Sequence, residues 1–171
     1  MTAVPLARRA AAELVGTAVP AQITGAIGGA VLADAMFAKP LVHFSTHHRS
    51  APHLLLGEVV ATAGLILLIF GLTRAQRAHL APVAVASCIG AAYWFTSSTS
   101  FANPAVTIGR AFTDTFAGIA PASAPGFVTA QLAGLALGLA LVTALFGRSA
   151  QATADDLVAP HGQPDRIGSA H

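Results

Sequence analysis

Ser100-Phe-Ala-Asn-Pro-Ala-Val-Thr-Ile-Gly-Arg110 places an Asn-Pro-Ala tripeptide, Asn103 to Ala105, a few residues after a long apolar run. Asn is favoured as the residue that caps the start of a helix, and Pro is favoured as the first helical residue. We therefore expect a short helix that begins at Pro104 and reaches about Phe116. The tripeptide alone is weak evidence for a function, because it arises by chance in alanine-rich chains, so the regions around it decide its meaning.

The regions on either side have the composition of membrane-spanning helices. Hydrophobic residues make up 54% of the 171 residues and charged residues 9%, whereas a soluble domain carries about 25% charged residues. Asp, Glu, Lys and Arg are absent from residues 59–73, 78–109 and 115–147. Three such intervals in a short chain favour spans, each of which needs about 20 mostly apolar residues.

The chain is therefore predicted to be an all-α integral membrane protein with about four spans, at residues 10–37, 54–72, 79–95 and 127–146. We expect residues 1–9 to be a cytoplasmic N-terminus, residues 10–147 to form the transmembrane domain, and residues 148–171 to be a disordered polar tail. Six Lys and Arg residues fall in the expected inner segments, and Lys39, Arg49 and Arg110 fall in the outer ones. This bias supports a multi-pass cell-membrane protein with both termini inside.

Other classes of function find little support. A polar loop at residues 39–53 holds four histidines: His43, His47, His48 and His53. Their spacing matches no firm ligand pattern, so we expect a solvated or interfacial loop without a metal or other cofactor. The basic pI of 9.3 has no basic cluster behind it, which argues against a nucleic-acid partner. We see no catalytic constellation that would indicate an enzyme, and we expect the single Cys88 to be a small buried hydrophobe.

Two short patterns recur along the chain and suggest an internal repeat. Glu-x-x-x-Thr begins at Glu13 and again at Glu58, and Ala-Gln-x-x-Gly contains Gln22 and then Gln131. A carboxyl group inside an apolar helix is costly unless it has partners, so these positions are candidates for buried structural residues. Echoed helices in two halves are typical of channels and transporters built from inverted repeats.

With these echoes around it, the Asn-Pro-Ala segment resembles that of aquaporins and glycerol facilitators. The stretch from Tyr93 to Ser123 is most similar to bacterial aquaglyceroporins associated with arsenic resistance. The resemblance implies an aquaporin-like helical bundle, a lipid bilayer as surroundings, and assembly as a homotetramer. Members of the family have six spans and two half-helices, each opening with Asn-Pro-Ala. We therefore expect that the first Asn-Pro-Ala loop and the second helix are missing, with a join near residues 18–20.

The resemblance also implies a pore at Asn103, Pro104 and Ala105, with the positive end of the half-helix dipole facing the solute. The family's selectivity constriction maps onto Ala91, Ser100 and Val106. Val106 stands where the family usually has Arg, and Ala91 stands where water-selective members have His. A wider and less polar path is expected, which suits small neutral solutes such as glycerol, water, urea or arsenous acid.

Two further expectations concern charged residues. The resemblance implies that Glu58 accepts hydrogen bonds from the re-entrant backbone and that Glu13 has lost its usual surroundings. Arg110 lies about 9 Å along a helix beyond Pro104, so we expect it to extend to the outer surface, with a role in the outer vestibule as the alternative. Two hypotheses stay open: a passive channel for small uncharged solutes, and a non-conducting remnant or accessory membrane subunit, which the missing loop favours.

Overall fold

The computed structural model describes the backbone of residues 6–146 and the side chains of residues 19–146. Every regular element within these residues is helical. The elements are α1 (Leu6–Met36), α2 (Pro52–Arg74), the 3-10 helix η1 (Ala78–Leu80), α3 (Ala81–Phe95), α4 (Pro104–Arg110), the 3-10 helix η2 (Pro121–Ser123) and α5 (Ala124–Phe146).

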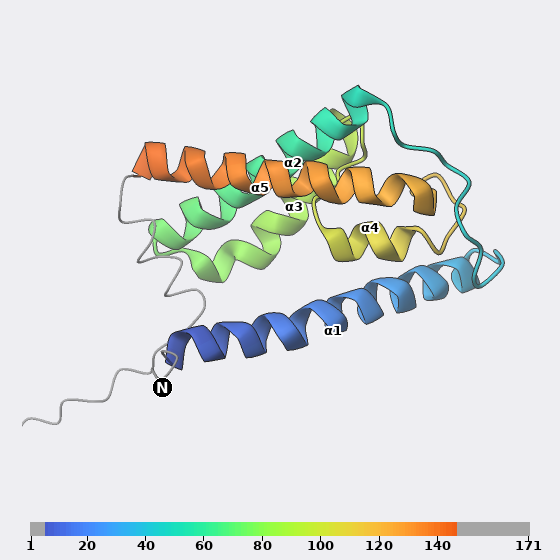
Figure 1. Cartoon of the computed structure of the whole chain (residues 1–171), viewed down its shortest axis with the longest axis horizontal. Helices are drawn as coiled ribbons and strands as arrows, with labels where there is room; N and C mark the ends of the chain where they lie inside the picture. Colours follow the sequence, from blue (N-terminus) through green and yellow to red (C-terminus); the bar gives the residue numbers. More distant parts are fainter. Residues whose placement is uncertain (1–5, 147–171) are drawn as a thin grey trace, which may run out of the picture.

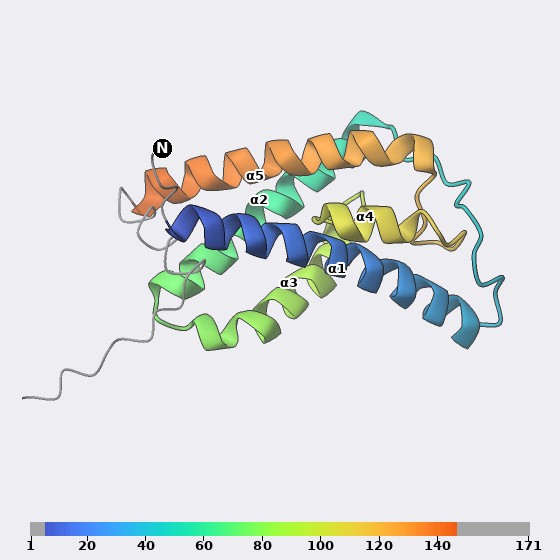
Figure 2. The same cartoon turned by 60° about the horizontal axis from the view of Figure 1, so that its bottom comes forward.

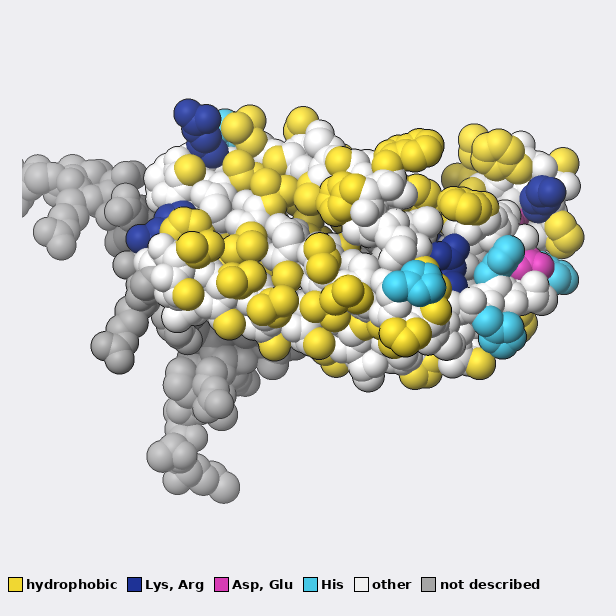
Figure 3. All heavy atoms as spheres, turned by 90° about the horizontal axis from the view of Figure 1, so that it is seen from above, with side chains coloured by type: hydrophobic (Ala, Val, Ile, Leu, Met, Phe, Trp, Pro, Cys, Tyr) yellow, Lys and Arg dark blue, Asp and Glu magenta, His cyan; other side chains and the backbone are white. Residues whose placement is uncertain are grey.

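Four segments of the described chain are long and apolar enough to cross a membrane. They are Val19–Met36, Pro52–Arg74, Ala78–Phe95 and Pro121–Phe146, with mean hydropathies between 1.2 and 2.3. Hydrophobic side chains cover much of the flank of the molecule, whereas Lys, Arg, His and Asp side chains gather towards its ends (Figure 3). The predicted all-α membrane fold with four spans is confirmed.

The helices form a bundle in which α2 and α5 pack along one another and α3 lies against α2 (Figure 1). The short helix α4 runs beside the N-terminal half of α5, with its own N-terminus towards the middle of the molecule. Helix α1 packs mainly against α4 and lies away from the α2–α5 pair (Figures 1 and 2). The half-helix thus bridges α1 and the rest of the bundle.

Small residues allow the closest helix contacts. A Cβ atom on Gly134 of α5 would lie 2.7 Å from the carbonyl oxygen of Val59 on α2, and one on Gly138 would lie 2.9 Å from Cβ of Ile66. Between α4 and α1, a Cβ atom on Gly109 would lie 2.7 Å from Cβ of Ala26. Within membranes, where apolar lipid surrounds the helices, such close approach is a main source of helix association.

Helix α1 runs without a break through residues 18–20, where we expect the join. Pro20 lies inside the helix, and its carbonyl oxygen accepts a hydrogen bond from Oγ1 of Thr24 at 2.9 Å. Membrane helices tolerate an internal proline better than soluble helices do. The missing segment itself stays a prediction, because a continuous helix is compatible with either origin.

The predicted end of the half-helix at Phe116 is wrong, because α4 ends at Arg110. Beyond it the backbone pairs with the loop that follows α1. The nitrogen of Ser45 donates to the carbonyl oxygen of Ala111 at 3.1 Å, and the nitrogen of His43 donates to that of Phe112 at 3.2 Å. These carbonyl oxygens therefore bind the loop, and the helix does not continue.

We expect Gly134→Ala to destabilise the protein. The new methyl group would overlap Val59 and Thr62 and push α2 and α5 apart, at a cost of about 1–3 kcal/mol. Gly64→Ala on α2 is the matched control, because a Cβ atom there meets nothing within 4 Å, and it should be neutral or slightly stabilising. Unfolding by SDS titration from detergent micelles measures both, and equal stability of the two variants would contradict the packing argument.

Candidate functional site

The loop between α3 and α4 is held by the carboxylate of Glu58, which lies on α2 and is 0% exposed. Its Oε1 accepts a hydrogen bond from the backbone nitrogen of Phe101 at 2.9 Å, and its Oε2 accepts one from the nitrogen of Ala102 at 2.9 Å. Nε2 of Gln131 on α5 donates to the same Oε2 at 2.7 Å. Both oxygens are therefore occupied, and one side chain connects α2, the loop and α5.

The same loop has an unfavourable backbone conformation. Thr99, Ser100 and Ala102 have positive φ angles of 63°, 47° and 50°. Non-glycine residues avoid this region, and each such residue costs roughly 1–3 kcal/mol unless its surroundings hold it there. The Glu58 hydrogen bonds fall on Phe101 and Ala102, within this run, so we attribute the persistence of the turn to them.

Asn103 caps the start of α4. Its φ and ψ angles are −154° and 125°, and its Oδ1 accepts a hydrogen bond from the nitrogen of Ala105 at 2.8 Å. Pro104 is the first helical residue, as the sequence predicts. Oδ1 already has a partner in the cap, whereas the Nδ2 group of Asn103 carries the N–H donors that a solute could meet.

Thr107 connects α4 to the buried hydrogen bonds that Glu58 and Gln131 form. Its Oγ1 accepts a hydrogen bond from Nε2 of Gln131 at 2.9 Å and lies 3.1 Å from the carbonyl oxygen of Asn103, to which it donates. Thr107 is 0% exposed and Gln131 is 2% exposed. The orientation of α4 is therefore fixed from α5 as well as from its own N-terminal loop.

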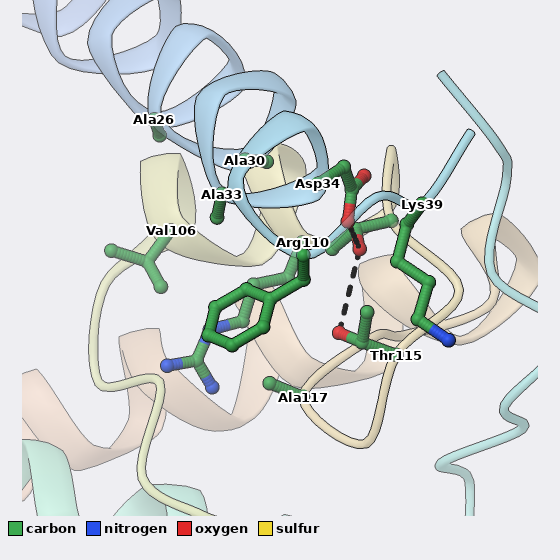
Figure 4. A pocket seen from close by; sticks show the side chains of 11 residues that line it. Ala26, Ala30, Ala33, Asp34, Lys39, Val106, Arg110, Thr115 and Ala117 are labelled. Carbon is green, nitrogen blue, oxygen red and sulfur yellow. Dashed lines mark hydrogen bonds between the residues drawn. The ribbon is translucent and has the colours of Figure 1, made fainter. Parts of the chain in front are cut away.

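A cavity of about 600 Å³ lies between α1, α4 and the loop that follows α4 (Figure 4). Its lining consists of Ala26, Ala30, Ala33, Asp34, Phe37, Lys39, Val106, Arg110, Thr113, Thr115 and Ala117. Of the three expected constriction residues, Val106 lines this cavity. Ala91 is exposed on α3 and Ser100 is 1% exposed in the strained loop, so the structure does not bring the three together around one opening.

Arg110 does not extend to the surface as the sequence suggests. Its guanidinium group is half-buried and lies over two aromatic rings, 4.3 Å from the ring centroid of Phe101 and 5.2 Å from that of Tyr93. A guanidinium over an aromatic face gains a favourable electrostatic interaction. Arg110 lines the cavity between α1 and α4, and the alternative expectation, a role in the outer vestibule, stays a prediction.

Arg49, in the loop after α1, is a structural residue that sequence reasoning missed. Its guanidinium donates to the carbonyl oxygens of Gly118 at 2.8 Å, Phe116 at 2.7 Å and Ser98 at 3.2 Å. Burial lowers the pKa of Arg49, and the nearby charge of Arg110 lowers it further. Its partners lie 49 to 69 residues away in sequence, so no local pattern could have revealed them.

The histidine-containing loop at residues 39–53 is mostly exposed, and Asp114 binds it through hydrogen bonds. The nitrogen of Thr46 donates to Oδ1 of Asp114 at 2.8 Å, and this hydrogen bond lowers the pKa of Asp114. Nδ1 of His43 and Nε2 of His47 each lie 3.8 Å from an oxygen of the same carboxylate. Within the described residues no three His, Cys, Asp or Glu side chains form a group that could hold a metal ion.

Comparison with known proteins identifies a relative of this chain. Aquaglyceroporin AqpS of Rhizobium meliloti (strain 1021) is 48% identical to the chain over 122 residues, which is 71% of the chain and 52% of the relative. This chain belongs to the aquaporin family. It is a multi-pass membrane protein that spans about half the length of this relative. No family model matches the chain, and no solved structure matches it.

The two aquaporin-like echoes differ in their surroundings. Gln131 is buried, but Gln22 is exposed on α1, so the expectation that Gln22 is a buried structural residue is wrong. The reason is the isolation of α1, which meets α4 at Ala26 and has open space around Gly25. The side chain of Glu13 lies outside the described residues. Cys88 is half-buried, which corrects the expectation of a buried thiol.

We expect Glu58→Gln to lower stability in detergent by about 1–3 kcal/mol, because a buried donor then loses its acceptor. The amide has one oxygen, whereas Phe101, Ala102 and Gln131 together present donors to both oxygens of the carboxylate. The free energy of unfolding, measured by SDS titration with helical circular dichroism as the readout, tests this.

Gln22→Ala is the control for that experiment, because Gln22 stands at the echoed but exposed position. Its effect should stay within about 0.5 kcal/mol, as is usual for exposed sites. A Glu58→Gln variant as stable as the parent chain would remove the carboxylate from its assigned place at the centre of the network.

Proposed function

We propose that the chain supplies the outer half of a passive pathway for small uncharged solutes. The observation that supports this is the cavity of about 600 Å³ beside the half-helix, which extends from Val106 to the outer loop. A cavity in this place, beside a half-helix that starts with Asn103 near the middle of the molecule, is what the outer vestibule of a channel requires. The wall is apolar where α1 contributes three alanines and polar where Asp34 and Arg110 lie.

The size and chemistry of the wall favour neutral solutes over ions. Val106 offers no charge and no hydrogen bond at the position where most aquaporins have an arginine. The half-buried side-chain amide of Asn103 has N–H groups to donate, and such donors suit the oxygens of water, glycerol or a neutral metalloid acid. The relative is named an aquaglyceroporin, which favours glycerol among these candidates.

A second candidate, a membrane subunit that does not conduct by itself, rests on the inner half of α1. Gln22 is exposed, and added Cβ atoms on Gly25 and Gly28 would meet nothing within 4 Å. Within the described residues α4 is the single half-helix that starts with Asn-Pro-Ala. Further copies in the same orientation would point their α4 helices the same way, and the Lys and Arg bias disfavours an inverted copy.

The outer vestibule predicts that Val106→Cys reacts with a charged, membrane-impermeant thiol reagent added to intact cells. The variant is made in a Cys88→Ala background so that it carries the only thiol. An aqueous cavity at Val106 exposes the thiolate to water, and modification should be complete within minutes. Labelling is measured by a mass shift of the purified chain.

Leu132→Cys in the same background is the control for depth. Leu132 is 55% exposed on α5. It follows Gln131, whose side chain contacts Thr107, the residue after Val106, so the two cysteine positions are matched in depth. We expect it to face lipid and to remain unmodified. Equal protection of Val106→Cys and Leu132→Cys would show that the cavity is closed to water.

The incomplete inner half predicts that the chain alone does not form a sealed, selective pore. Proteoliposomes containing the purified full chain should show permeability to water, glycerol and arsenous acid close to that of empty liposomes, because half of the path lacks a lining. Stopped-flow light scattering measures each rate. Permeability well above the empty liposomes that Asn103→Leu abolishes would demonstrate a working channel in this chain.

A further inference from the structure

The loop that follows α1 exposes a group of large hydrophobic side chains. Within residues 36–44, side chains that are between 54% and 75% exposed belong to Met36, Phe37, Leu41, Val42 and Phe44. We call these five side chains the α1-loop patch. Exposed hydrophobic surface gathered in one place marks a site where a protein or a membrane binds.

The α1-loop patch continues an exposed side of α1. Leu32 is 63% exposed and Met36 is 75% exposed, and residues four apart lie on the same face of a helix. The span in α1 ends at Met36 and the next span begins at Pro52, so the residues between them lie at the edge of the membrane. Lipid that covers the exposed side of α1 therefore reaches the residues that directly follow it.

Residues 42–45 have a polar side and an apolar side. The backbone nitrogens of His43 and Ser45 both pair with the segment that follows α4, and side chains alternate between the two sides of such an extended backbone. Nδ1 of His43 and Oγ of Ser45 lie 3.8 Å and 3.3 Å from the carboxylate of Asp114. Val42 and Phe44 belong to the other side and are 59% and 57% exposed. A segment divided in this way suits a boundary between water and hydrocarbon, as amphipathic elements in general do.

The charge of the loop also fits a lipid surface. Lys39 is the single charged residue among residues 36–44, and it is exposed. A lysine beside lipid rests its carbon chain on apolar surroundings while its ammonium group reaches water and lipid phosphate. Figure 3 shows hydrophobic side chains beside Lys, Arg and His side chains at one end of the molecule. This mixture is what the interface between headgroups and acyl chains accommodates.

We propose that the α1-loop patch inserts into the lipid interface and anchors the end of α1. Its hydrophobic side chains enter the region between headgroups and acyl chains, while His43, Ser45 and Asp114 remain on the side of the water. The anchor matters to α1, because within the described residues this helix packs mainly against the short helix α4. The inference goes beyond the proposed function and does not require the chain to conduct.

Tryptophan fluorescence locates the patch relative to the lipid. The chain contains one tryptophan, Trp94, which is 90% exposed. Val42→Trp in a Trp94→Phe background therefore carries a single reporter. The full chain is placed in phosphatidylcholine nanodiscs, and its emission is quenched either by lipids brominated in the upper part of the acyl chain or by iodide in the water. We expect strong quenching by brominated lipid and weak quenching by iodide.

His48→Trp in the same background is the matched control. His48 is exposed in the same loop and lies outside the patch. Both variants introduce the same indole, so the preference of tryptophan for membrane interfaces acts equally on them. We expect iodide to quench His48→Trp severalfold more strongly than Val42→Trp, and brominated lipid to show the reverse order.

Two results would overturn the proposal. Iodide quenching of Val42→Trp as strong as that of His48→Trp would mean that water surrounds the patch. Protection of Val42→Trp from both quenchers would mean that protein covers it, for example a second copy of the chain. Thermal melting in the same nanodiscs verifies folding, and Leu41→Trp provides the same test if Val42→Trp does not fold. Labelling of Val106→Cys can fail without any change in this quenching, so the two inferences are tested separately.

Discussion

The buried carboxylate of Glu58 is the interaction on which the rest of the structure depends. A chain that turns back inside a membrane leaves backbone N–H groups that neither a helix nor water can satisfy. Glu58 accepts two of them, from Phe101 and Ala102, while Gln131 binds the same carboxylate. This contact needs α2 and α5 to lie very close, and Gly134 provides that closeness. The small residues allow the close contact of α2 and α5, and this contact brings the Glu58 carboxylate to the loop and to Gln131. The direction of α4 depends on both.

Helix α4 exists because both of its ends are fixed. It has seven residues, and isolated helices shorter than about 12–15 residues are marginal even in favourable sequences. At its start it has the Asn103 cap and the Thr107–Gln131 contact. Beyond its end, the loop from α1 binds the free carbonyl oxygens, and Arg49 holds the segment at Phe116 and Gly118. The loop between α1 and α2 therefore helps to support the half-helix and is more than a connection between spans.

Features that depend on neighbours in sequence could be predicted, and features that depend on distant contacts could not. The four spans follow from long intervals without charge, and the cap at Asn103 follows from the preferences of Asn and Pro. The end of α4 could not be read, because the residues up to Phe116 contain no stop signal and a distant loop ends the helix. The position of Arg110 escaped for the same reason: Tyr93 and Phe101 come from other segments. The spacing from Pro104 predicted a surface position for Arg110, but its interaction with the two aromatic rings keeps it half-buried.

The two Ala-Gln-x-x-Gly echoes show how far a repeated sequence determines a repeated structure. On α5, the glutamine binds a carboxylate and the glycine touches α2. On α1, the glutamine is exposed and the space around Gly25 is empty. The same five-residue pattern is therefore insufficient for the contact without a partner that carries the matching groups. The alanine face of α1 does have such a partner, since Ala26 meets Gly109 while Ala30 and Ala33 leave open the space beside Arg110. The position of the cavity thus follows from where α1 touches α4 and where it is too small to do so.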